Sequence, residues 1–260
     1  MKFGLSLPNA GPVARLVEVA RLADSNGWDG VFLWDHIHLF RDLRLELHDP
    51  WVTLGAIAQV TSNVRLGTMV TPLPRRRPQK FAKEVVTLDH LSNGRVVVGV
   101  GLGFPPADEY TMFGEDGDDR ARADRLDEAL EVVTALWTSQ PIEHRGAHYS
   151  VSAELHPCPL QRPRPPIWVA AMCPNRRPLH RAARYEGVAP IGADGQPITH
   201  DELAQVARAV GSRLDVIASR MSGPTVDEYA AAWATWLSDS RWPADDWLDE
   251  LHASASRGPR

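Results

Sequence analysis

Two side chains that can exchange protons stand directly after a short apolar run near the N-terminus. The run is Val31–Trp34, and Asp35 and His36 follow it in GVFLWDHIHLF. A buried charge is costly unless something pairs with it, so an acid and an imidazole at the end of a buried strand indicate a functional site. Histidine titrates near neutrality, which makes His36 a candidate for proton transfer.

The same stretch contains an H-x-H pattern formed by His36 and His38. Some metal-dependent hydrolases use this spacing, and Asp239 near a late predicted strand is a candidate further ligand. Both histidines point inward only if the chain stays extended, and His180, a later histidine, falls within a predicted helix. A metal-dependent hydrolase is therefore an alternative to proton transfer at His36.

Apolar runs and amphipathic stretches alternate along the chain, which predicts eight strand–helix units. The strands are continuously apolar, as in a parallel sheet covered by helices. With 260 residues, eight near-equal units favour a closed (β/α)₈ TIM barrel of the α/β class over an open doubly wound sheet. We expect one domain, 1–260. The predicted strands are 2–8, 30–34, 64–72, 95–103, 167–171, 187–192, 214–219 and 235–238.

The helices predicted between these strands are marked by capping and stop signals. Asp49 and Pro50 are typical of a helix start, and Asn93-Gly94 of a helix end. A proline-rich, loop-rich stretch, 138–166, interrupts the alternation between the fourth helix and the fifth strand. We interpret it as an insertion lying over the barrel, where it either closes over the site or packs outside it. The predicted helices are 13–28, 49–63, 78–94, 118–137, 177–185, 200–211, 225–234 and 244–255.

The composition argues against nucleic-acid and membrane partners. The net charge is -5 at pH 7, and no apolar run is long enough to span a bilayer. The basic run 75–77 is therefore interpreted as a solvated loop. Two cysteines and the lack of an N-terminal signal peptide predict a reducing, cytoplasmic compartment, and a small molecule is the expected partner.

Small residues dominate the predicted ends of the fourth and fifth strands, where a TIM barrel carries its active site. Gly101 and Gly103 would let a ring or a backbone approach closely. The stretch VGVGLGF is not a dinucleotide-binding loop, because Phe104 and Pro106 stand where a third glycine is required. Few acid–base groups line this end, which suits a flat apolar ligand that brings its own chemistry.

The turn after the fifth strand offers one further candidate site. A helix begins shortly after this turn, and its free N–H groups could hold a phosphate with help from Arg176 or Arg177. A plain turn explains the spacing equally well.

Four segments together resemble the luciferase-like flavin oxidoreductases, a family that includes bacterial luciferase, flavin-dependent monooxygenases and enzymes that use the deazaflavin coenzyme F420. The most specific is TLDHLSNGRVVVGVG, and the resemblance covers residues 1 to about 192. The segments are FGLSLP, GWDGVFLWDH, VRLGTMVTPLPRRRPQKFAKEVVTLDHLSNGRVVVGVGLG and PPIWVAA.

This resemblance implies a barrel that binds F420, or alternatively FMN, at the carboxyl ends of its strands. Asp35 and His36 match the Asp-His pair that lies beside the deazaflavin ring. The bulged third strand, Thr68 to Val70, would support the ring with a non-proline cis peptide between Met69 and Val70. The phosphate end would lie near the turn after the fifth strand, which comprises Ala171, Met172, Cys173 and Pro174.

The family also implies a mechanism and a homodimer. With F420, hydride transfer is accompanied by proton transfer at His36, and Asp35 orients His36 or contacts the ring edge. With reduced FMN, oxygen adds to the ring, giving a monooxygenase. Phe40 and Phe104 could form an apolar wall for a small organic substrate. The alternatives are the metal-dependent hydrolase and a barrel that binds a cofactor without catalysis.

Overall fold

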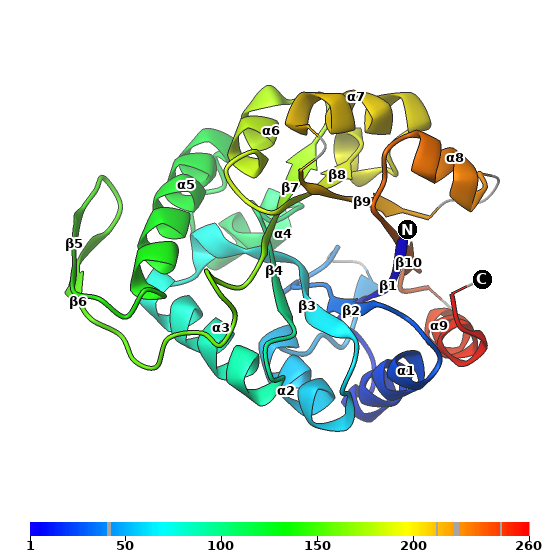
Figure 1. Cartoon of the computed structure of the whole chain (residues 1–260). Coiled ribbons are helices and arrows are strands. Elements are labelled where there is room, and N and C mark those ends of the chain that lie inside the picture. The colour runs from blue at the N-terminus through cyan, green and yellow to red at the C-terminus, as the bar shows by residue number, and fades with distance from the viewer. Residues whose placement is uncertain (41–42, 212, 221–223, 245, 260) are drawn as a thin grey trace.

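A computed structural model describes residues 1–40, 43–211, 213–220, 224–244 and 246–259. Eight parallel strands of these ranges close into a barrel in the order β1-β2-β3-β4-β7-β8-β9-β10, with β10 pairing back to β1 (Figure 1). This confirms the predicted TIM barrel. The barrel strands are β1 Lys2–Leu7, β2 Gly30–Leu33, β3 Arg65–Pro72, β4 Val96–Gly101, β7 Ile167–Met172, β8 Gly187–Ile191, β9 Asp215–Ser219 and β10 Trp236–Ser240.

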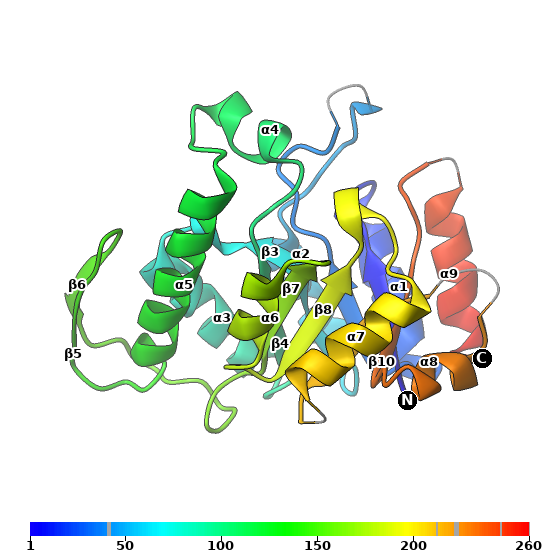
Figure 2. The same cartoon turned by 90° about the horizontal axis from the view of Figure 1, so that it is seen from above.

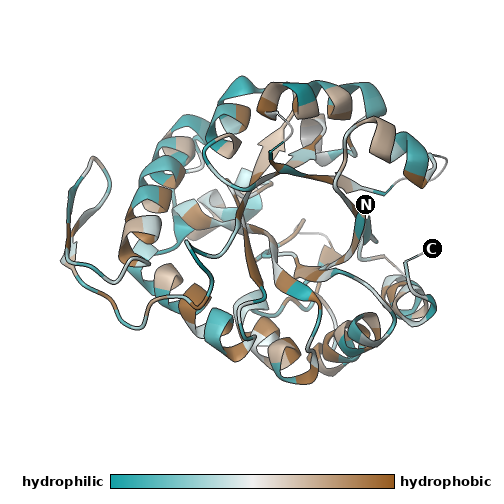
Figure 3. Ribbon diagram, viewed as in Figure 1, coloured by the Kyte–Doolittle hydropathy of each residue, from teal (hydrophilic) through white to brown (hydrophobic). Residues whose placement is uncertain are grey.

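Helices surround this barrel, and their apolar faces pack against the outside of the strands (Figure 3). None of the helices in the described ranges is both long and apolar enough to cross a membrane. The helices are α1 Val13–Ser25, α2 Pro50–Val60, α3 Pro78–Leu91, α4 Pro106–Glu109, α5 Asp119–Leu136, α6 Arg176–Ala182, α7 His200–Val210, α8 Val226–Ala231 and α9 Trp247–Arg257, with short 3₁₀ turns at Leu73–Arg75, Thr111–Phe113 and Ala193–Gly195.

Local sequence signals explain where several of these elements begin and end. The Asp49 side chain accepts a hydrogen bond from the Val52 amide and caps α2, and Pro50 takes the first helical position, as predicted. The predicted last strand, 235–238, is a full barrel strand that extends to Ser240. Trp236 to Ser240 pair with β1, and the first three of them also pair with β9. Closure stabilises this strand more than its own sequence would suggest.

An aromatic cluster fills the barrel interior. Its members come from strands that are not all neighbours, so their side chains meet inside the barrel; they are Phe32, Val97, Trp168, Ile217 and Trp236. The ring centroids of Trp168 lie 5.2 Å from those of Phe32 and 5.1 Å from those of Trp236. This cluster closes the barrel below the level at which ligands would bind.

Of the two placements expected for residues 138–166, packing outside the barrel is the one that occurs. This insertion contains an antiparallel hairpin, β5 Ile142–Arg145 and β6 Ser150–Ala153, which lies outside α5 (Figure 1). The Glu128 carboxylate of α5 accepts hydrogen bonds from the amides of His148 and Tyr149 and contacts the His144 ring. The Glu128 carboxylate therefore holds the hairpin against the outside of α5, away from the carboxyl ends of the strands.

A second carboxylate anchors the end of the insertion. Asp89 of α3 is fully buried and accepts hydrogen bonds from the amides of Leu160 and Gln161 and from the Gln161 side chain, at 2.6 to 3.1 Å. Gln161 also donates to the Val96 carbonyl. Asp89 thus links α3, the insertion and the start of β4, which explains its place in the TLDHLSNGR segment.

Replacing Asp89 with Ala should lower the free energy of unfolding by about 2–4 kcal/mol, because three donors lose a charged, fully buried acceptor. Removing the helix cap with Asp49→Ala should cost about 1 kcal/mol and serves as the control. Urea unfolding followed by circular dichroism measures both. Equal losses in the two variants would contradict the anchoring role of Asp89.

Candidate functional site

Asp35 lies buried at the carboxyl face, the end of the barrel where the carboxyl ends of the strands meet. In Figure 2, the segment after β2 and the helix α4 both project from this end. The Asp35 carboxylate accepts hydrogen bonds from Arg75 (2.8 Å), Arg76 (2.9 and 3.1 Å) and the Thr71 hydroxyl (2.7 Å). These four bonds match the acceptor capacity of a carboxylate and compensate its burial.

The interpretation of 75–77 as a solvated basic loop is therefore wrong for its first two members. The Arg75 side chain is only 4% exposed and Arg76 is half-buried. Arg75 ends the 3₁₀ turn after β3 and Arg76 caps it, and this turn carries their guanidinium groups across to Asp35 after β2. The sequence of three successive arginines does not itself show whether their side chains are solvated or form buried ion pairs.

His36 is held by a residue that the sequence analysis did not identify. Its Nδ1 lies 2.7 Å from the Glu109 carboxylate of α4, and Glu109 also forms an ion pair with Arg75. An ionised carboxylate only accepts hydrogen bonds, so this contact assigns the proton to Nδ1 and leaves Nε2 as the acceptor. The Asn9 side-chain amide donates a hydrogen bond to the backbone carbonyl of His36 (2.8 Å) and so fixes the backbone there.

Burial sets the charge of the His36 ring. Desolvation, assisted by the positive charge of Arg75 and opposed by Asp35, lowers the pKa of His36 to about 4. The imidazole is therefore neutral at pH 7, in the form that accepts a proton.

Contacts of Arg122 and Tyr110 hold the segment between β4 and α5, which includes α4 and Glu109. The buried Arg122 side chain of α5 donates to the carbonyls of Leu102 and Gly103, and its guanidinium lies 4.8 Å from the centre of the Tyr110 ring. The Tyr110 hydroxyl donates to the Leu102 carbonyl (2.6 Å). Burial raises the pKa of Tyr110 to about 12, so it remains a donor.

The third strand contains the bulge implied by the family resemblance. The pairing of β3 with β4 shifts between Thr68 and Thr71, and the peptide between Met69 and Val70 is cis, which confirms that expectation. The Thr68 hydroxyl bonds to the Gly99 carbonyl and to Thr71, which in turn contacts Asp35. The bulge and the Asp35 cluster are thus one connected structure.

Glycines of β4 make room for this bulge. A Cβ atom added at Gly99 would lie 2.0 Å from the Thr68 carbonyl oxygen. One added at Gly101 would lie 2.8 Å from the Val70 side chain and 3.2 Å from Ala170. The close approach is to the backbone of β3 at Gly99 and to the side chains of Val70 and Ala170 at Gly101, so the inner side of the bulge is lined by small residues.

In the turn after β7, most backbone N–H groups already have acceptors within the protein and are not free to bind a phosphate. The Cys173 amide donates to the Ile191 carbonyl (2.8 Å), the Asn175 amide donates to the Met172 carbonyl (3.1 Å), and Pro174 has no N–H. Arg177 forms ion pairs with Asp124 and Asp127 of α5. The predicted phosphate cradle at Ala171 to Pro174 therefore lacks support from the donors of these residues.

The metal alternative also lacks support. Within the described ranges, no three His, Cys, Asp or Glu side chains are grouped as a metal site would require. His36 Nδ1 is engaged by Glu109, and Asp239 lies 3.5 Å from Arg220. His38 is half-buried, and its Nδ1 has no hydrogen-bond partner among the described residues.

The two predicted substrate residues lie in separate loops of the carboxyl face. Phe40 packs on Trp242, which follows β10, at a centroid distance of 5.5 Å. Phe104 follows β4 and is exposed, and a Cβ atom at Gly195 would lie 3.5 Å from its ring. In the described part of the chain the two rings have different neighbours, Trp242 for Phe40 and the Gly195 turn for Phe104.

The model of the luciferase-like monooxygenase family matches residues 1–247. The chain belongs to this family. An F420-dependent hydroxymycolic acid dehydrogenase of Mycobacterium tuberculosis is 35% identical over 172 residues, which is 66% of this chain and 47% of that protein. The oxygenase component of a flavin-dependent trigonelline monooxygenase of Acinetobacter baylyi is 31% identical over 161 residues, 62% and 43% of the two chains.

Solved structures support the same fold for this luciferase-like chain. The F420-dependent tetrahydromethanopterin reductase of Methanopyrus kandleri superposes with a TM-score of 0.79 at 15% identity, covering 99% of this chain and 98% of that one. The chain spans about half the length of the two sequence relatives just described. The family includes both F420-dependent and flavin-dependent proteins, so a flavin or deazaflavin cofactor is common to these relatives.

His36 should make the stability of this luciferase-like protein depend on pH between about 4 and its unfolded value of 6.5. In that window the unfolded state binds the extra proton, so the free energy of unfolding falls as pH is lowered. The loss is at most about 3 kcal/mol. His36→Gln should lack it, as measured by urea unfolding at a series of pH values. The control is His180→Gln, on the exposed side of α6. A His36→Gln variant with the wild-type pH dependence would contradict this assignment.

Proposed function

We propose that this protein is an F420-dependent oxidoreductase that transfers a hydride to or from a small organic substrate, with His36 exchanging the accompanying proton. The observation that carries the proposal is the contact between Glu109 and His36 Nδ1. It leaves Nε2 unprotonated beside the predicted cofactor site, and burial keeps the ring neutral at pH 7.

His36 would act as general base in substrate oxidation and as general acid in reduction. F420, when bound, accepts or donates the hydride. As His36 Nε2 takes up the substrate proton, the ring becomes an imidazolium, and the Glu109 carboxylate beside Nδ1 stabilises that charge. Arg75 neutralises the same carboxylate and so limits how strongly the imidazolium is favoured. The proton can therefore be returned in the opposite direction.

The residues of the β3 bulge fit a flat ring. Met69 and Val70 leave the ladder at the bulge, and the neighbouring inner positions, Gly99, Gly101 and Ala170, carry little or no side chain. A ring placed against the Met69–Val70 peptide would lie near Thr71, which contacts Asp35. In this proposal, Asp35 holds the two arginines and positions the edge of the site, whereas Glu109 orients His36.

A flavin-dependent monooxygenase is the second candidate, and the trigonelline monooxygenase relative favours it. In that case FMN would occupy the same site, and His36 would again supply a proton acceptor. F420 is preferred here because the Asp-His pair after β2 resembles that of the F420 enzymes and because an F420-dependent relative is 35% identical.

The purified protein should bind F420 more tightly than FMN, as measured by titrating the fluorescence of each cofactor. We expect at least about a tenfold difference in Kd. Gly101→Val is the test of location, because its side chain would collide with Val70 and weaken binding. Gly55→Ala, on the outer side of α2 where a Cβ atom meets nothing within 4 Å, is the control. Tighter binding of FMN would favour the monooxygenase, and binding of neither would overturn the redox proposal.

His36→Gln should lower the rate of hydride transfer by about 10²–10⁴-fold, because general acid–base catalysis is lost. The Kd for F420 should change little, since the proposed ring site is formed by β3. Glu109→Gln should give a smaller loss and also move the pH profile of reduction to lower pH, because the imidazolium loses its carboxylate. Stopped-flow absorbance of F420 measures both. An unchanged rate in His36→Gln would remove its proposed role.

A further inference from the structure

Three aromatic side chains form a continuous row on the carboxyl face beside His36. We call Trp34, Phe40 and Trp242 the aromatic wall. Trp242 lies 5.9 Å from Trp34 and 5.5 Å from Phe40, measured between ring centroids, and the Trp34 ring meets His36 edge-on at 5.8 Å. The wall joins the end of β2 to the end of β10, two strands that flank β1.

The aromatic wall exposes apolar surface to solvent close to His36. Trp242 is 51% exposed and Phe40 is 37% exposed. Trp34 is fixed from below, because its indole N–H donates to the Ser6 hydroxyl at 3.0 Å. Exposed aromatic rings that are held in place and grouped beside a candidate catalytic side chain are typical of a surface that binds an apolar ligand.

Four arginines of the carboxyl face are already paired with carboxylates. Arg75 and Arg76 bind Asp35, Arg220 lies near Asp239, and Arg241 contacts Glu250 at 2.7 Å. An anionic substrate would have to compete for these guanidinium groups. An uncharged substrate does not need a free guanidinium group, so these ion pairs do not weaken its binding.

Hydroxyl groups lie on the inner side of β10 near the base of the wall. Ser238 and Ser240 alternate with residues of the outer side and share the inward face with Trp236. Ser238 is 4% exposed, and the hydroxyl oxygens of both serines are buried without a hydrogen-bond partner among the described residues. Ser240 stands opposite Ser6, the partner of Trp34. A neutral oxygen on a ligand would satisfy such a hydroxyl.

We propose that the aromatic wall and Ser238 together bind an uncharged substrate that has an apolar body and a single hydroxyl or carbonyl oxygen. The inference rests on the proposed function, because it names the substrate class of that site. The apolar body packs on Trp242, and the oxygen is oriented by Ser238 and faces His36. In oxidation the alcohol carbon gives its hydride to F420, the hydroxyl proton goes to His36 Nε2, and a carbonyl compound leaves.

The test compares two matched probes, benzyl alcohol and benzoate, by ligand-observed NMR titration of the protein with and without F420. Benzyl alcohol should bind at least about tenfold more tightly than benzoate. Trp242→Ala should weaken benzyl alcohol binding by about fivefold or more. Ser238→Ala should weaken benzyl alcohol by about threefold or more and leave the binding of toluene, which has no oxygen, unchanged.

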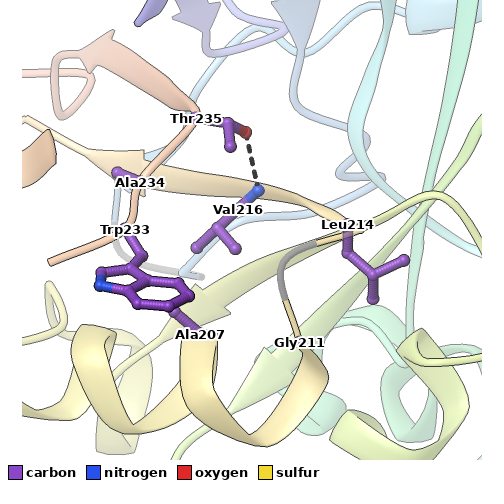
Figure 4. Close-up of a pocket in the computed structure, with 7 residues that line it drawn as sticks. All are labelled: Ala207, Gly211, Leu214, Val216, Trp233, Ala234 and Thr235. Atoms are coloured by element: carbon purple, nitrogen blue, oxygen red, sulfur yellow. Dashed lines mark hydrogen bonds between the residues drawn. The ribbon is translucent and has the colours of Figure 1, made fainter.

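Trp233→Ala is the matched control, because Trp233 is 55% exposed but precedes β10 at the opposite end of the barrel. It lines a pocket of about 220 Å³ with residues of α7, of β9 and of the segment just before β10 (Figure 4). The pocket provides an alternative place for an apolar probe. The Trp233→Ala variant should retain wild-type affinity for benzyl alcohol. If Trp233→Ala weakens benzyl alcohol binding and Trp242→Ala does not, the proposal is overturned.

The outcomes separate this inference from the proposed function. If F420 binds and reacts while Trp242→Ala and Ser238→Ala leave the affinity and the preference for benzyl alcohol unchanged, the inference fails alone. Equal binding of benzyl alcohol and benzoate also overturns it. If F420 does not bind but the probe binding depends on Trp242 and Ser238, the proposed function fails and the ligand site is supported.

Discussion

The Arg75 guanidinium is the interaction on which the candidate site depends. It binds both Asp35 at the end of β2 and Glu109 of α4, two buried carboxylates that would otherwise repel each other. This cation compensates the burial of both acids, and for Asp35 it does so together with Arg76. Glu109 can then hold His36 Nδ1, and Asp35 can bind Arg76 and Thr71. The charge of one side chain thus joins the loops that follow β2, β3 and β4.

The β3 bulge gives this charged cluster a fixed relation to the barrel. Thr71, just past the bulge, contacts both Asp35 and Thr68, so the backbone of Met69 and Val70 is coupled to the ion pairs. The glycines of β4 are required for the same reason, because side chains at Gly99 and Gly101 would collide with the bulge. In the proposed function, ring support and proton transfer are therefore properties of one rigid assembly rather than of two separate sites.

Much of the fold could be predicted because it follows from local patterns. Continuous apolar strands, amphipathic helices and the Asp49-Pro50 cap have short-range physical causes, and they led to the TIM barrel. Other features depend on partners that are distant in the chain. The sequence allowed the insertion to close over the site or to pack outside it, and Glu128 and Asp89 hold it beside α5 and α3. Nothing in the proline-rich stretch itself indicates which helix supplies those acceptors.

The sequence by itself determined the barrel, the family resemblance and the position of Asp35 and His36 at a strand end, because periodicity and motif are local properties. Only the tertiary structure decided what those residues contact. Glu109 lies 73 positions from His36 and Arg75 lies 40 positions from Asp35, so their pairing arises from the barrel bringing successive strand ends together. The tautomer and lowered pKa of His36 follow from that meeting, since both depend on burial and on charges from other loops.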